Sequence, residues 1–126
     1  MSFLTLLAVF LGGGSGAVCR YALGRFIAGH YSGIFPIGTF LINITGCFTL
    51  GLLATVLANS YPNNTVPTAL LATGFLGGYT TFSTYALESV LLYLDGSIRP
   101  ALTNALGSVL VGLAAAALGA GVGHVV

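Results

Sequence analysis

The stretch GGYTTFSTY, residues 77–85, opens with two glycines and then carries hydroxyl groups on six of its next seven side chains. The chain on either side of it is apolar enough to lie in lipid. Glycines at positions 74, 77 and 78 weaken a helix here. At membrane depth, irregular backbone is tolerated only where it is buried in protein or lines a wet cavity. The stretch therefore predicts a membrane helix broken into two half-helices.

The composition of the whole chain points to a bilayer as its solvent. Of the 126 residues, 56% are hydrophobic and only 4% are charged, whereas about a quarter of a soluble domain is charged. Between Phe26 and Leu87 there is no Asp, Glu, Lys or Arg. The net charge of +1 is too small to attract nucleic acid. We expect a multi-pass membrane protein with no nucleic-acid partner.

Four segments reach the length of about 20 apolar residues that a helix needs to cross the hydrocarbon. They span roughly residues 3–24, 36–58, 66–94 and 100–123. None of them alternates apolar and polar residues as a barrel strand would. We predict an all-α membrane protein, in which residues 1–126 form one four-span domain with the third helix broken mid-membrane.

Arginine placement gives only a weak orientation signal. Arg25 and Arg99 lie in the two connections on one side, while the middle connection and both tails hold no Lys or Arg. This bias permits a single orientation or a mixture of both, and a chain that inserts both ways can form an antiparallel homodimer. The small residues Gly12 and Gly16, four apart, are typical of helices that approach closely.

Three of the spans carry a polar stripe at helical spacing. The stripes are Thr39, Asn43 and Gly46 in the second span; Thr81, Thr84, Tyr85 and Glu88 in the third; and Asn104, Ser108 and Gly112 in the fourth. Such stripes serve either interhelical hydrogen bonds, worth about 0.6 kcal/mol each on average, or an ion or substrate pathway. Three stripes beside a broken helix favour the pathway.

The chemistry of the stripes suits a small, hard anion, because donors are many and fixed charges few. Asn43 can donate through its amide group, and the electropositive ring edges of Phe82 and Tyr85 can meet an anion edge-on. Backbone carbonyls freed at Gly77 and Thr80 offer a second site, for a cation.

Two ionisable side chains lie within these spans. Glu88 is either a gate or proton-linked group, or a hydrated group near a membrane edge. We expect Arg20 to draw anions into a vestibule rather than only to extend its charge to the membrane surface.

Three pieces of the sequence carry a family resemblance: GGGSGAVCRY (12–21), GTFLINITG (38–46) and GFLGGYTTFSTYALE (74–88). With these pieces the chain resembles the Fluc (CrcB) fluoride channels over nearly its full length. The resemblance implies a fluoride-selective passive channel of the cell (inner) membrane that exports cytoplasmic fluoride and gives fluoride resistance. It also implies an antiparallel, dual-topology homodimer with two pores.

The resemblance further implies particular sites. A structural sodium ion would lie at the dimer centre, held by the backbone carbonyls of Gly77 and Thr80. The implied fluoride pore comprises Asn43, Phe82, Ser83, Thr84, Tyr85, Glu88 and Ser108, with Asn104 and Gly112 as further lining candidates. To these the polar stripe of the second span adds Thr39 as a pore residue, and we expect Arg20 in the vestibule. Tyr85 departs from the phenylalanine usual at its position, which leaves the effect of the added hydroxyl open.

Two other functions compete with a channel. A small four-helix, proton-coupled multidrug exporter needs a membrane-centred carboxylate early in the chain, yet the first two spans contain no Asp or Glu. A non-transporting assembly subunit would leave the polar stripes without a role. Because no phosphate-binding loop or catalytic triad occurs in the sequence, we do not expect an enzyme.

Overall fold

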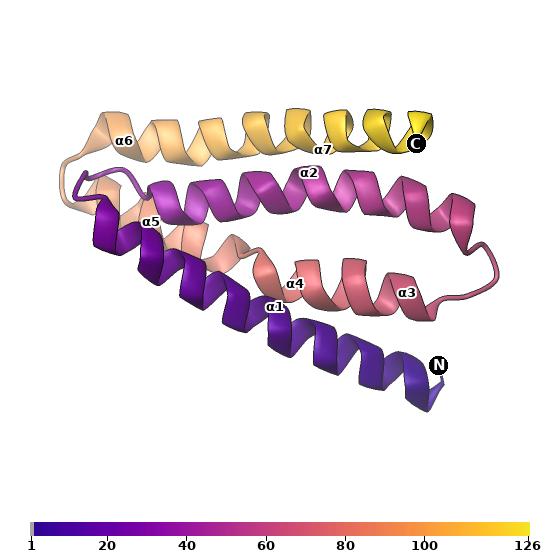
Figure 1. Ribbon diagram of the computed structural model, residues 1–126. Helices are drawn as coiled ribbons and strands as arrows, with labels where there is room; N and C mark the ends of the chain where they lie inside the picture. Colours follow the sequence, from indigo (N-terminus) through magenta and orange to yellow (C-terminus); the bar gives the residue numbers. More distant parts are fainter. Residues whose placement is uncertain (1) are drawn as a thin grey trace.

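The computed structural model describes residues 2–126, and this part of the chain is helical with no strand (Figure 1). The elements are α1 (Phe3–His30), α2 (Ile37–Ser60), α3 (Val66–Thr68), η1 (Ala69–Leu76), α4 (Gly77–Tyr79), α5 (Phe82–Leu94), α6 (Ile98–Leu102), η2 (Thr103–Gly107) and α7 (Ser108–Val125). Both η elements are wider, π-helical turns. They continue the flanking helices, so α3–η1–α4 and α6–η2–α7 each form one rod.

The predicted all-α architecture of four membrane helices, with the third one bent, is confirmed. Within residues 2–126, three helices are long and apolar enough to cross a membrane: Phe3–His30, Ile37–Ser60 and Ile98–Val125. The third segment is divided into two shorter helices, α3–η1–α4 and α5. Both termini lie at the end of the bundle that also holds the α2–α3 connection (Figure 1).

The third helix is broken, but its glycines are not where it breaks. Gly74, Gly77 and Gly78 are all helical. The extended residues are Thr80, with ψ 160°, and Thr81, with φ −149° and ψ 115°. Both are β-branched threonines, which suit extended backbone better than a helix interior. The prediction that the glycines themselves break the helix is therefore wrong.

Gly74 and Gly78 instead allow α1 to approach the third helix closely. Gly12 faces Gly74, and a Cβ built on Gly12 would lie only 2.8 Å from the backbone nitrogen of Phe75. A Cβ on Gly16 would lie 2.9 Å from the nitrogen of Tyr79. These distances are shorter than any carbon side chain tolerates, so backbone packs directly on backbone.

A second close pair joins α2 to α7. A Cβ on Gly51 would lie 2.9 Å from the nitrogen of Ala120, and one on Gly119 would lie 3.0 Å from the nitrogen of Leu52. Small residues at such contacts let membrane helices pack through van der Waals contact of their backbones. These two closely packed pairs form the frame that holds the broken segment.

The two pairs meet at a small buried cluster. Ile42 from α2 packs with Leu76 and Tyr79 from the third helix, and partly buried Leu23, Leu53 and Phe75 surround them. The cluster lies just before the break, so it fixes the end of α4 against α2.

The close approach of α1 to the third helix predicts that Gly16→Ala destabilises the protein. The added methyl group would overlap the backbone of Phe75, and such overpacking costs about 1–3 kcal/mol. The free energy of unfolding in lipid or detergent measures the loss. Gly14→Ala is the matched control, because a Cβ there meets nothing within 4 Å. Equal stability of the two variants would contradict the close packing.

Candidate functional site

The break in the third helix is closed by one side chain from α2. The Asn43 amide nitrogen donates to the carbonyl oxygen of Thr81 at 2.9 Å, and the Asn43 amide oxygen accepts from the Thr81 backbone N–H at 2.8 Å. Backbone polar groups in the hydrocarbon region must be paired inside the protein. Asn43 thus supplies both partners that the interrupted helix cannot supply to Thr81.

At the break, two carbonyl groups lose their helical donors. In a continuous α-helix the N–H of Thr81 would bond Gly77, and the N–H of Thr84 would bond Thr80. The Thr81 N–H instead bonds Asn43. The Thr84 N–H bonds the Thr81 hydroxyl at 3.2 Å, which caps the start of α5. The carbonyls of Gly77 and Thr80 are therefore free of these donors.

The polar stripe of α2 meets the broken segment at three successive positions. Thr39 donates its hydroxyl to Glu88 at 2.8 Å, and Asn43 bonds Thr81. At Gly46 the missing side chain leaves room for the methyl group of Thr80. The stripe therefore holds the break and the half-helix that follows it against α2.

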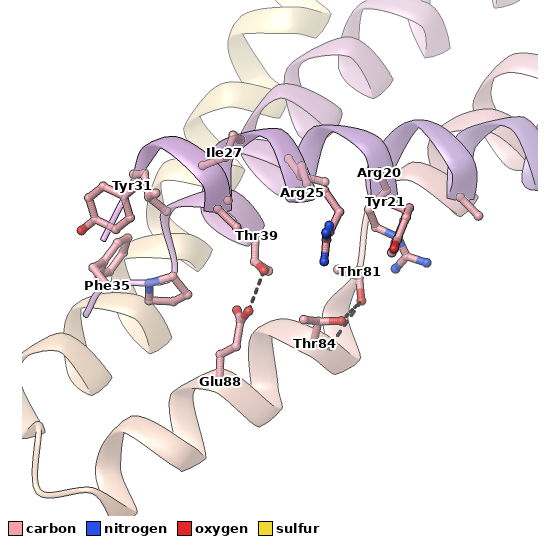
Figure 2. Close-up of a pocket in the computed structure, with 17 residues that line it drawn as sticks. Arg20, Tyr21, Arg25, Ile27, Tyr31, Phe35, Thr39, Thr81, Thr84 and Glu88 are labelled. Carbon is pink, nitrogen blue, oxygen red and sulfur yellow. Dashed lines mark hydrogen bonds between the residues drawn. The ribbon is translucent and has the colours of Figure 1, made fainter. Parts of the chain in front are cut away.

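A cavity of about 560 Å³ lies on one side of the break. Its polar lining consists of Arg20, Tyr21, Arg25, Tyr31, Thr39, Thr81, Thr84 and Glu88. Figure 2 shows the side chains of Arg20 and Arg25 on α1 along one wall, with Thr84 and Glu88 on α5 along the opposite wall. We call this cavity the outer pocket.

The outer pocket holds both positive and negative groups. One oxygen of Glu88 accepts from Thr39, while the other, Oε2, is buried and has no hydrogen-bond partner in residues 2–126. Arg25 joins Arg20 in the lining because α1 continues to His30 instead of ending near residue 24. The sequence analysis placed Arg25 in the connection between two spans, and it therefore did not predict that Arg25 lines a pocket.

A second cavity, of about 350 Å³, lies on the other side of Asn43. We call it the inner pocket, and its lining includes Asn43, Thr80, Thr81, Phe82, Tyr85, Ser108 and Gly112. The rings of Phe82 and Tyr85 lie with their centroids 5.5 Å apart at an angle of 51°. Phe82 is 78% exposed. Thr81 lines both pockets, so the pockets adjoin at the break.

A hydrogen-bond chain joins the rod α6–η2–α7, which we call the fourth rod, to α5. Ser108 donates to the amide oxygen of Asn104 at 3.1 Å, Asn104 donates to the Ser89 hydroxyl at 2.9 Å, and Ser89 donates to the Tyr85 carbonyl at 2.9 Å. Asn104 is only 1% exposed and lines neither pocket. A buried side-chain amide needs hydrogen-bond partners. Ser89 is one such partner of Asn104, and the sequence analysis did not single it out.

The structure divides the expected pore residues between the two pockets. Arg20, Thr39, Thr84 and Glu88 line the outer pocket, whereas Asn43, Phe82, Tyr85 and Ser108 line the inner one. Ser83 lines neither; it is exposed, with its hydroxyl 3.4 Å from that of Thr81.

These features define a class: a small multi-span membrane protein in which pockets with several polar lining residues flank a broken helix. Residues 7–120 match the family described as CrcB-like protein, Camphor Resistance (CrcB). The chain belongs to this CrcB family.

Curated relatives cover almost the whole chain. A protein of Paracoccus denitrificans is 44% identical over 95% of this chain and 94% of its own length. One from Rhodococcus jostii is 47% identical over 92% and 96%, and one from Solibacter usitatus is 42% identical over 90% and 93%. The first and third are named fluoride-specific ion channel FluC, and the second FluC 2. None of these three relatives is named as a multidrug exporter, so the comparison does not support that alternative function.

The pairing at the break predicts that Asn43→Asp destabilises the fold. A carboxylate still accepts from the Thr81 N–H but has no proton for the Thr81 carbonyl. Leaving such a group unpaired costs about 1–3 kcal/mol, measured as the free energy of unfolding in lipid. Asn64→Asp is the matched control, since the Asn64 side chain acts only as an acceptor, from the Val66 N–H. Equal free energies of unfolding for the two variants would contradict the pairing of Asn43 with Thr81.

Proposed function

We propose that this chain forms a passive, fluoride-selective ion channel that lets cytoplasmic fluoride leave the cell and so confers fluoride resistance. The observation that carries this proposal is a pair of adjoining pockets, each with polar side chains in its lining, which offers a route through an otherwise apolar bundle. The outer and inner pockets adjoin at Thr81, where the third helix is interrupted. The names of the relatives point to the same ion.

The lining of this route favours an anion. Arg20 and Arg25 place two guanidinium groups at the outer pocket, which attract negative charge. At the break, Asn43 uses one of its amide hydrogens on Thr81, and its second remains available as a donor. Beyond it, the ring edges of Phe82 and Tyr85 are electropositive. These donors are uncharged, and they can bind a small, hard anion at the break without a fixed positive charge beside it.

Passive flow suffices for fluoride export. Hydrogen fluoride crosses membranes as a neutral molecule and ionises in the near-neutral cytoplasm, so fluoride accumulates there. The membrane potential acts on each charge with about 2.3 kcal/mol per 100 mV, and it drives an anion outward. The only acidic residues of the chain are Glu88 and Asp95, and neither lies in α1 or α2, where a proton-coupled exporter of the competing class would carry its carboxylate.

The active unit in this proposal is an antiparallel homodimer. Gly77 has ordinary helical angles, φ −63° and ψ −37°, and a Cβ there would meet nothing within 4 Å. Nothing inside one subunit therefore requires glycine at this position, although close approach of a second copy would. The Arg25 and Arg99 bias is weak enough to permit insertion in both orientations.

A sodium ion fits the break of such a dimer. The carbonyls of Gly77 and Thr80 are released from their helical donors because Thr81 and Thr84 bond elsewhere. Unpaired carbonyls are costly in a low-dielectric region, and carbonyl oxygens are the ligands that hard cations prefer. In this proposal the two carbonyls of each subunit hold one structural sodium ion at the dimer centre.

The channel proposal predicts fast fluoride efflux from liposomes that contain the purified protein. Chloride efflux should be far slower, and fluoride efflux should need no proton gradient. Ion-selective electrodes measure both ions, with empty liposomes as the control. Comparable chloride efflux, or fluoride efflux that requires a proton gradient, would rule out a passive fluoride-selective pore.

The dimer and sodium proposals predict that Gly77→Leu yields a folded monomer. The added side chain meets nothing within 4 Å of its Cβ in one subunit, so helical content should persist while sodium-dependent association is lost. Circular dichroism and sedimentation with and without sodium measure the two effects. Gly121→Leu is the control, because its Cβ also meets nothing within 4 Å. Dimers of Gly77→Leu that keep their sodium dependence would refute the central site.

A further inference from the structure

The ring of Tyr85 lines the inner pocket, but its hydroxyl group bonds the backbone of the fourth rod. The hydroxyl donates to the carbonyl oxygen of Ala105 at 2.6 Å. This distance is at the short end for a hydrogen bond between two oxygens. The proton of the hydroxyl is thus committed to Ala105, which leaves the ring to face the route.

The acceptor lies in an unusual part of the fourth rod. Ala105 is in the middle of the π-helical turn η2, Thr103–Gly107. Such turns are rare and occur frequently at functional sites. A side chain that bonds a carbonyl within such a turn supports its wider geometry.

The bond fixes the Tyr85 ring at both ends. Its Cα belongs to α5, and its hydroxyl is attached to η2 across the helix interface. The chain from Ser108 through Asn104 and Ser89 joins the same two elements. That chain ends on the Tyr85 backbone carbonyl, however, so it does not hold the ring.

We propose that Tyr85 is a positioning residue of the inner pocket, whose hydroxyl ties the ring to the wide turn η2. This inference rests on the proposed channel function. This hydrogen bond to Ala105, which we call the tie, holds the ring edge toward the anion route. It also sets the separation between α5 and the fourth rod. A phenylalanine at this position would present the same edge but would be held only by its Cα.

Fluoride efflux from liposomes tests the positioning role through Tyr85→Phe. The variant keeps the ring and loses only the tie. We expect the efflux rate to fall about fivefold, the factor that corresponds to one net hydrogen bond. Tyr93→Phe is the matched control, because Tyr93 lies on the same helix and is 62% exposed, and its efflux should equal that of the unmodified protein. Unchanged efflux in Tyr85→Phe would overturn the positioning role.

Solid-state NMR tests the tie without any flux measurement. Labelling with ¹³C-carbonyl alanine and ¹⁵N-leucine selects the Ala–Leu pairs of the chain, which begin at Ala22, Ala69, Ala86, Ala101, Ala105 and Ala117. We expect Tyr85→Phe to move the Ala105 carbonyl signal most, and Tyr93→Phe to move none of them. An unmoved Ala105 signal would refute the tie. If the unmodified protein carries no fluoride, the channel proposal fails, whereas this spectrum still decides whether the tie exists.

Discussion

A helix interrupted inside a bilayer leaves backbone groups without partners, and the pairing of Asn43 with Thr81 meets this requirement. One carboxamide on α2 satisfies both the N–H and the carbonyl group of Thr81. The same pairing takes the Thr81 N–H away from Gly77. The pairing at the break therefore depends on one side chain of α2, while the Thr81 hydroxyl takes the Thr84 N–H that would otherwise bond Thr80.

The frame that holds this side chain is built from backbone contact rather than from large apolar residues. Glycines let α1 approach the first half of the third helix, and others let α2 approach α7. Individual interhelical hydrogen bonds in membranes contribute only about 0.6 kcal/mol on average. Close packing must therefore place Asn43 and Thr81 within reach before their bonds can hold the break. The first half of the third helix belongs to one close pair and Asn43 to the other.

Much of the fold was predictable from the sequence, since run length and the absence of charge identify four helical spans. The position of the break was not. Gly74 and Gly78 look like helix breakers, but they serve contact with α1, which only the three-dimensional arrangement reveals. Spacing placed Asn43 on the polar stripe of the second span but did not predict its pairing with Thr81. The partner of the Tyr85 hydroxyl is a backbone carbonyl, which no residue type marks. Arg25 was missed because α1 runs past its predicted end.

The central claim is that Asn43 closes the break by bonding both backbone groups of Thr81. A high-resolution cryo-electron microscopy map of the protein in lipid nanodiscs tests it most directly. We expect density for extended backbone at Thr80 and Thr81, with the Asn43 amide within hydrogen-bond distance of both the nitrogen and the oxygen of Thr81. A continuous third helix, in which the Thr81 N–H bonds the Gly77 carbonyl and Asn43 points elsewhere, would contradict the account.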